Sequence, residues 1–319
     1  MSDKLRIIQI THRKLTSVFV EQNGCFADFN TSDSWVILSS IEQSIKKKIN
    51  YYGKPLKEWE IEIYRGILTG CNDAFIISGQ KRDELIAADP KSAEIIRPVL
   101  RGRDIGRYKA TYADLWLIAT FPSKQYDIEN YPAVKDYLLS FGIERLEQSG
   151  KIHIIGDKTI ESRKKTNNKW FETQDSISYW DDFSKRKIVW ARLSRISTKD
   201  FNDFPKFCIV DEGYVTLDSL CFFTGPNLDS LVKVLNSKYA AYYFFKNVAI
   251  LDNGGMQMRQ QYVENICIPF NALKALELCH DETQYDKIIL EAFCLTEEEQ
   301  NYIEDYLNKK KEEIEDTQR

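Results

Sequence analysis

Residues 163–171, which read Arg-Lys-Lys-Thr-Asn-Asn-Lys-Trp-Phe, have the side chains with the clearest chemical potential in the sequence. Lysine and arginine bind phosphates, arginine also fits the O6 and N7 atoms of guanine, and asparagine fits adenine. A threonine methyl group contacts the methyl group of thymine. The segment therefore contains what is needed to bind a DNA duplex and to distinguish its bases. A plain polar surface loop is the alternative interpretation.

Two further segments concentrate positive charge. Residues 97–109 contain five basic residues and one acidic residue, and residues 185–199 contain six basic residues and no acidic one. The net charge of the chain is −4, because residues 281–319 carry 13 acidic and five basic residues. Local patches, rather than net charge, set the affinity for phosphates. Unless these runs are merely solvated, we expect contacts with DNA from Arg101, Arg103, Arg107, Arg163, Lys164, Lys165, Asn167, Asn168, Lys169, Arg192, Arg195 and Arg259.

Two glycine-containing segments are further candidates for contacts with a ligand. Residues 66–72 place two glycines four positions apart, which suits a positive φ or a close approach of the backbone. Residues 254–262 begin with a Gly-Gly pair and continue as a polar helical pattern, which could direct helix N–H groups at a phosphate. An ordinary turn and a helix entry without a ligand explain the two patterns equally well.

No catalytic motif is present in the sequence. It has no Gly-x-Gly turn, of the kind that lets the backbone approach S-adenosylmethionine, and no Asn-Pro-Pro-Tyr motif for an amino-methyltransferase. The triplet Asp89-Pro90-Lys91 is the only acid-x-lysine pattern, and it reads as a turn at a helix break. The three histidines are far apart in sequence, and the adjacent pair Cys279-His280 supplies too few ligands for a tetrahedral metal site. We therefore predict neither a catalytic site nor a metal or cofactor site in this chain.

The cysteine pattern and the hydropathy indicate the environment in which the protein works. Seven cysteines are scattered singly without a Cys-x-x-Cys pair, which is typical of reduced thiols in the cytoplasm. Hydrophobic residues make up 43% of the chain, an ordinary globular share, yet no run of 18 apolar residues exists. We expect a cytoplasmic globular protein that does not enter a membrane.

Strands and helices are expected to mix without a regular alternation, which indicates an α+β (mixed α/β) fold with a C-terminal helical tail. Strands are predicted at 5–10, 17–21, 34–40, 61–66, 74–77, 115–120, 187–191, 207–210 and 214–223. Helices are predicted at 41–49, 81–88, 91–96, 132–141, 227–246, 256–265, 285–293 and 296–315, the last with Thr296 as its N-cap and Glu299 completing a capping box. Residues 142–187 read as a long loop, and long loops tend to be functional.

Several motifs in order carry a resemblance to a known family. The sequence closely resembles the TaqI-like C-terminal specificity domain, the target-recognition module of adenine-specific DNA methyltransferases and of type IIG restriction-modification enzymes. The resemblance runs from about Lys46 to Phe270 and rests on Gly53–Leu56, Tyr64–Ile67 through Phe75–Ile77, Arg97–Ile105, Lys164–Glu172, Lys187–Trp190, Leu235–Lys238 and Gln261–Ile266.

The resemblance implies a sequence-specific reader of double-stranded DNA that packs beside an adenine methyltransferase domain or subunit. That partner would bind S-adenosylmethionine and methylate an adenine flipped out of the duplex. We expect residues 1–280 to form the recognition domain, with 1–50 as a connecting segment and 281–319 as an acidic helical tail. This chain lacks the family's catalytic domains, so we expect it to be non-catalytic alone. Alternatives are the C-terminal part of an enzyme and an assembly subunit whose tail docks a methyltransferase.

Overall fold

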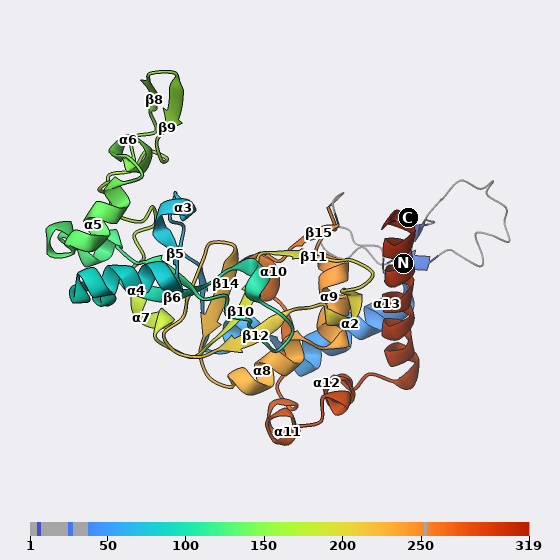
Figure 1. The fold of residues 1–319 in the computed structure, drawn as a ribbon. Helices are drawn as coiled ribbons and strands as arrows, with labels where there is room; N and C mark the ends of the chain where they lie inside the picture. The colour runs from blue at the N-terminus through green and yellow to red at the C-terminus, as the bar shows by residue number, and fades with distance from the viewer. Residues whose placement is uncertain (1–4, 8–24, 28–37, 252–253, 319) are drawn as a thin grey trace.

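A four-stranded antiparallel sheet divides the computed structural model into two halves (Figure 1). The structure describes residues 5–7, 25–27, 38–251 and 254–318. The sheet has the strand order β12 (Phe207–Val210), β10 (Lys187–Ala191), β14 (Leu220–Thr224) and β4 (Glu62–Arg65). Alternate side chains of a strand point to opposite faces, so Ile188 and Trp190 enter one hydrophobic core and Val189 enters the other. Burial on both faces explains why β10 and β14 read as continuous apolar runs.

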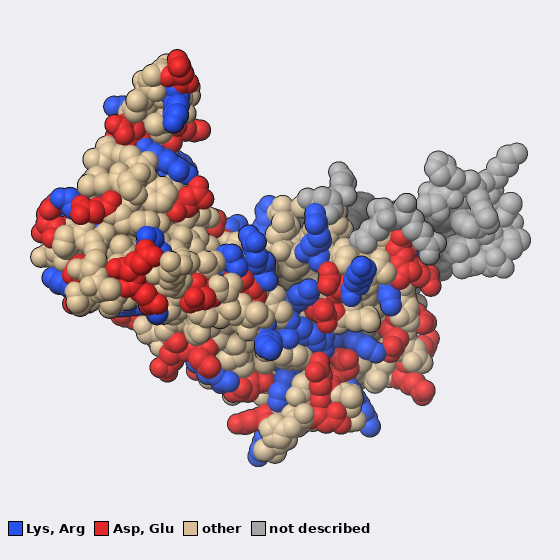
Figure 2. Space-filling view, in the orientation of Figure 1, with Lys and Arg blue, Asp and Glu red and all other residues tan. Residues whose placement is uncertain are grey.

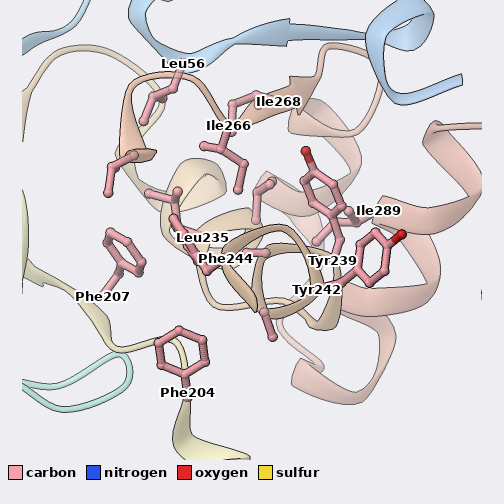
Figure 3. Close-up of a cluster of buried hydrophobic side chains, with 14 of the residues drawn as sticks. Leu56, Phe204, Phe207, Leu235, Tyr239, Tyr242, Phe244, Ile266, Ile268 and Ile289 are labelled. Carbon is pink, nitrogen blue, oxygen red and sulfur yellow. The ribbon is translucent and has the colours of Figure 1, made fainter. Parts of the chain in front are cut away.

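Helices cover one face of this sheet. They are α2 (Ser40–Tyr52), α8 (Leu228–Leu235), α9 (Lys238–Asn247), α11 (Leu273–Leu278), α12 (Tyr285–Ala292) and α13 (Glu297–Gln318), joined by the antiparallel pair β3 (Gly53–Pro55) and β16 (Cys267–Pro269). Tyr239 and Phe244 of α9 are fully buried, and Figure 3 shows them among side chains that converge from the sheet and from β16. The aromatic stripe of α9 therefore belongs to the core.

A second sheet covers the other face. Its order is β13 (Val215–Thr216), β6 (Ile96–Leu100), β7 (Leu115–Ile118) and β5 (Ile76–Ser78), and only the β13–β6 pairing is parallel. The helices of this half are α3 (Asn72–Phe75), α4 (Gly79–Ala88), α5 (Pro132–Leu139), α6 (Ile143–Leu146) and α7 (Trp180–Phe183). The hairpin β8 (Ile152–Ile155) and β9 (Lys158–Glu161) projects from this half (Figure 1).

Shorter elements complete the fold. The pairs β1 (Leu5–Ile7) with β2 (Cys25–Ala27) and β11 (Leu193–Arg195) with β15 (Gly255–Gln257) are antiparallel, and α10 (Gln260–Val263) follows β15. The 3₁₀ helices are η1 (Leu56–Glu58), η2 (Pro90–Glu94), η3 (Gly102–Asp104), η4 (Pro122–Lys124), η5 (Ile128–Asn130), η6 (Phe201–Asp203) and η7 (Glu282–Gln284). The predicted α+β class is confirmed, and no helix in the described part of the chain is long and apolar enough to cross a membrane.

The single helix predicted over 227–246 is wrong, because the chain breaks between α8 and α9. At the break the Asn236 side chain accepts a hydrogen bond from the Phe207 backbone N–H at 2.9 Å and donates one to the Phe207 carbonyl at 2.8 Å. Ser237 then caps α9 by accepting from the Ala240 N–H. The two polar side chains thus tie the break to the edge strand β12.

Other predicted elements shift. Residues 255–257 form strand β15 instead of a helix, and residues 96–100 form strand β6 where a helix was predicted to end at 96. The stretch 74–77 divides between α3 and β5. Strands predicted at 17–21 and over most of 34–40 fall outside the described residues, and Ser40 already begins α2.

The acidic C-terminal tail is helical, as predicted, and packs against the folded body. Ile303, Leu307 and Ile314 of α13 are buried in the helical core. The predicted capping box is confirmed, since the Thr296 N–H donates to Glu299 at 2.7 Å and the Glu299 N–H donates to the Thr296 hydroxyl at 3.3 Å. The Glu299 carboxylate also pairs with Lys48 of α2 at 2.6 Å. Glu299 is thus buried between two helices, whereas Glu297, Glu298, Glu304 and Asp305 are exposed on the outer face of α13.

Candidate nucleic-acid interface

Four of the twelve predicted site residues meet at one groove. It has a volume of about 780 Å³ and lies where η3 approaches the β11–β15 pair and the start of β12. We call it the arginine groove, defined by its five basic side chains Arg103, Arg192, Arg195, Lys206 and Arg259. Figure 2 shows lysine and arginine side chains gathered over the middle of the molecule, in the region of these strands. Segments more than 150 residues apart in sequence thus supply one basic surface.

Hydrogen bonds between side chains and the backbone hold the lining of the groove together. The Arg192 guanidinium donates to the Asp218 carbonyl at 3.0 Å, and the Gly102 N–H donates to the Ser219 hydroxyl at 3.1 Å. These contacts join β11 and η3 to the turn before β14. The groove is therefore built on rigid elements rather than on a free loop.

Arg103 is held at the rim by its neighbours in η3. Arg101 does not enter the groove but makes two side-chain contacts with Asp104, at 3.0 and 2.8 Å, and its backbone N–H donates to the same carboxylate at 2.8 Å. This closes the turn that carries Arg103. Arg101 is thus placed to position Arg103 instead of contacting a ligand directly.

The electrostatics of the groove favour an anion. Its lining contains five basic side chains and two acidic ones, Asp200 and Asp218. Asp218 already pairs with Arg65 at 3.2 Å, and Asp200 accepts from the Ser197 hydroxyl at 2.8 Å. Arg103 and Arg195 are exposed and have no carboxylate partner among the described residues. Positive charge therefore remains available at the surface.

Residues 163–171, the segment with the clearest chemical potential in the sequence, begin at the base of a projecting arm. We define the arm as residues 147–165, which comprise the β8–β9 hairpin and its flanks. Lys164 and Lys165 are exposed there, and Asn167 and Lys169 are exposed just beyond it. Asn168 is half-buried, and its amide donates to the carbonyls of Gln174 at 2.9 Å and Thr173 at 3.3 Å. Asn168 thus shapes the loop.

The DNA contact predicted for Arg163 is corrected, because its side chain is only 4% exposed. The guanidinium donates to four backbone carbonyls at 2.7–2.8 Å, those of Leu146, Thr69, Glu172 and Trp170. It also lies over the Phe75 ring at 5.0 Å. Burial lowers the pKa of Arg163 to about 10. The residue holds the base of the arm together and is unavailable to a phosphate.

Arg107 faces the C-terminal tail instead of the groove. Its guanidinium pairs with Glu282 at 3.0 Å and lies over the Tyr108 ring at 5.1 Å. Of the twelve predicted residues, the groove gathers Arg103, Arg192, Arg195 and Arg259, and the arm and its flank carry Lys164, Lys165, Asn167, Asn168 and Lys169. Arg101, Arg107 and Arg163 have partners within the protein.

Lys206 and Gln257 are among the polar groove residues that sequence reasoning missed. Lys206 is an isolated lysine between aromatic residues, so it belonged to no basic run, and it lies 3.9 Å from Asp200. Gln257 accepts a hydrogen bond from Arg259 and presents its amide from β15. The alternation of side chains along residues 255–259 could have indicated Gln257, had that stretch been recognised as a strand.

The two glycine segments have structural explanations. At Gly66, a Cβ atom would lie 2.0 Å from the Leu217 carbonyl oxygen, so the glycine permits a close approach of two backbones. Gly255 begins β15, and no helix starts directly after the Gly-Gly pair. Within the described part of the chain, no group of three potential ligands is placed to hold a metal ion.

Comparisons with known proteins agree with the motifs. The model of the TaqI-like C-terminal specificity domain family matches residues 97–268, more than half of the chain. The match confirms the resemblance over that range, and the motifs before residue 97 lie outside it. A comparison with curated proteins finds no match.

One solved structure shows a related fold. The type IIL restriction-modification enzyme MmeI, solved in complex with DNA, is similar with a TM-score of 0.53 and 10% identity, over 92% of this chain and 40% of MmeI. The type IIG restriction endonuclease BpuSI aligns with a TM-score of 0.41 and 14% identity, over 80% of this chain and 28% of BpuSI. This chain thus spans less than half the length of either enzyme. It belongs to the family of TaqI-like C-terminal specificity domains.

Proposed function

We propose that this chain recognises a specific sequence in double-stranded DNA for an adenine-specific DNA methyltransferase or a type IIG restriction-modification enzyme. The observation that carries the proposal is the arginine groove, in which five basic side chains from four segments converge. Arginine and lysine neutralise phosphates, and arginine also reads guanine in the major groove. Membership of a specificity-domain family supports the same function.

In this proposal two surfaces of the protein contact the DNA. The arginine groove binds the phosphate backbone, which fixes the register of the duplex. The exposed polar residues just beyond the arm, Asn167 and Lys169, lie beside bases or phosphates. Figure 2 shows a concave outline between the projecting arm and the region of β11 and β15, which offers space for a duplex.

In the same proposal, methyl transfer belongs to a partner domain or subunit. That partner binds S-adenosylmethionine and acts on the flipped adenine, while this chain contributes recognition and no catalysis. The rival proposal of an assembly subunit that docks through its tail has less support. The apolar face of α13 is already buried in the chain's own core, so it is not available to a partner.

The salt dependence of binding to duplex DNA tests the proposal. Fluorescence anisotropy is measured for the full chain and for the triple variant Arg103→Gln, Arg195→Gln and Arg259→Gln. Each lost phosphate contact lowers the slope of log affinity against log salt by about 0.9, so the variant should lose about 2–3 units of slope. These side chains are at the surface, so the thermal stability of the variant should match that of the parent.

The matched control replaces two exposed lysines of the helical half, Lys274→Gln and Lys309→Gln. The control should retain both the affinity and the slope of the parent. Equal slopes for the parent and the groove variant would contradict a role of the arginine groove in phosphate binding.

A further inference from the structure

The outer part of the arm exposes apolar side chains that its own fold does not use. Ile152 and Ile154 of β8 are 67% and 79% exposed. In the register of the hairpin they lie opposite Glu161 and Thr159 of β9, so all four side chains share one face. Exposed apolar groups next to one another on an otherwise polar surface mark a contact site.

The arm is held in a defined position. At its base the Gly150 N–H donates to the Arg163 carbonyl at 2.9 Å, and the Ser162 N–H donates to the Lys151 carbonyl at 2.9 Å. The Gln148 amide, which is buried, donates to the Glu172 carbonyl at 3.0 Å. Together with the four hydrogen bonds of Arg163, these contacts fix the projecting ribbon to the body. The isoleucines are therefore presented on a rigid support.

The charge around the two isoleucines favours a polyanion. Exposed lysines lie along the length of the arm, and they outnumber its exposed carboxylates, those of Asp157 and Glu161. The remaining carboxylate of the arm, Glu147, lies 2.6 Å from His153. The four exposed lysines of the arm are Lys151, Lys158, Lys164 and Lys165.

The width of the β8–β9 hairpin suits the major groove of B-DNA. Paired strands lie about 4.8 Å apart, so a bare two-stranded ribbon with its side chains fits the major groove of B-DNA, which is about 12 Å wide. The turn adds little width, because Gly156 and Asp157 alone connect the strands and Gly156 has a φ of +61°. A protein partner with a large apolar surface would find only two isoleucines on this face, because Ile155, which is 49% exposed, lies on the opposite face of the hairpin.

We propose that the β8–β9 arm enters the major groove and that Ile152 and Ile154 contact the apolar parts of base edges. The thymine methyl group is the apolar group that the major groove presents. The lysines of the arm lie along the phosphates on either side. This inference rests on the proposed function and adds a base-reading element distinct from the arginine groove.

The test compares the double variant Ile152→Ser and Ile154→Ser with the control Leu278→Ser, in the full chain. Leu278 on α11 is 72% exposed and belongs to the opposite, helical half of the fold. Bound sequences are selected from a random duplex pool with the parent protein. The double variant should bind the selected duplex about tenfold more weakly with an unchanged salt slope, because apolar contacts release no counterions. The control should bind as the parent does.

A second measurement tests whether the two isoleucines contact thymine methyl groups. When deoxyuridine replaces thymine in the selected duplex, the C5 methyl groups are lost. The parent should then bind about as weakly as the double variant, and the double variant should lose nothing further. Equal losses for both proteins would overturn the placement of the isoleucines in the major groove.

The outcomes separate this inference from the proposed function. If the double variant binds the selected duplex as the parent does, while the triple groove variant loses affinity, the arm inference is overturned and the proposed function stands. In that case the isoleucines face another occupant, such as a protein surface. If the parent binds no duplex, both fail.

Discussion

Arg101 and Asp104 close the turn of η3 through two side-chain contacts of 3.0 and 2.8 Å, and Arg103 lies between them in sequence at the rim of the arginine groove. The Arg101–Asp104 ion pair therefore positions the side chain of Arg103, which is not a member of the pair. The same device occurs at the base of the arm, where the buried Arg163 supports a segment whose neighbouring lysines are exposed. In both places an arginine with partners inside the protein holds a neighbouring basic residue at the surface.

The first prediction concerns this turn. Asp104→Ala should weaken binding to duplex DNA about threefold to tenfold, because Arg103 loses its fixed position. In a background that already contains Arg103→Gln, the same substitution should have no further effect on affinity. Anisotropy titrations of the four proteins in this cycle give the coupling. Additive losses would show that Asp104 acts independently of Arg103.

The second prediction concerns Arg163. Arg163→Met removes the hydrogen bonds to four backbone carbonyls, of which that of Glu172 keeps the Gln148 amide as a donor, so we expect it to lower the free energy of unfolding by about 3 kcal/mol. Amide hydrogen exchange should accelerate at the base of the arm, at Gly150 and Ser162. The exposed neighbour provides the control, and Lys164→Met should leave both stability and exchange as in the parent. Slow exchange in the Arg163 variant would refute its supporting role.

The third prediction is a dependence of stability on pH. Burial opposes ionisation of Glu42, but hydrogen bonds from Lys246 and the Ser39 N–H outweigh it and lower the pKa of Glu42 to about 2. A carboxyl whose pKa is depressed on folding contributes stability that is present above the ordinary value of 4.5 and is lost as the pH falls from there toward 2. Unfolding measured between pH 6 and about 3 should show this loss.

Glu42→Gln should remove that contribution. The variant should be less stable by about 2 kcal/mol at neutral pH, and its stability should fall less steeply below pH 4.5. The exposed Glu298→Gln on α13 serves as the control and should follow the parent. Parallel pH profiles for the parent and the Glu42 variant would contradict the assignment.

The fourth prediction concerns Gly66. A Cβ atom there would lie 2.0 Å from the Leu217 carbonyl oxygen, which is backbone and cannot rotate away. Gly66→Ala should therefore lower the free energy of unfolding by more than about 3 kcal/mol. Gly102→Ala is the matched control, since its Cβ would meet nothing closer than 3.5 Å. Denaturant unfolding of both variants checks the difference, and equal stabilities would refute the close approach.

The sequence predicted many elements because their apolar patterns match their packing. The runs of β10 and β14 are buried on both faces, and the patterns of α12 and α13 place their apolar residues in the helical core. Periodicity failed at Asn236, where a side chain bonded to Phe207 breaks a continuous apolar pattern. That partner is 29 residues away in sequence, so local pattern could not indicate it.

The basic runs predicted the region of the site better than its residues. Within residues 185–199, Lys187 is fully buried, donates to the carbonyls of Phe183 and Lys185, and has its pKa lowered by burial to about 8. Arg186 pairs with Asp229 at 2.6 Å. Charge counts cannot separate such structural cations from exposed ones, because burial depends on tertiary contacts.

The β8–β9 hairpin of the arm could have been predicted from the sequence, although residues 142–187 read as a long loop. Residues 152–161 contain two short segments that flank Gly156 and Asp157, a pattern typical of a two-residue hairpin. Polar residues between the apolar ones obscured the strands. The exposure of Ile152 and Ile154, in contrast, follows only from the projection of the hairpin away from both cores.

Selection from a random duplex pool tests the central claim most directly. The full chain is equilibrated with the pool across a salt series, and the bound DNA is sequenced. Sequence-specific recognition predicts a linear fall of log affinity with log salt together with an enriched motif. Binding without enrichment, or no binding at low salt, would contradict the account of this chain as a reader of DNA sequence.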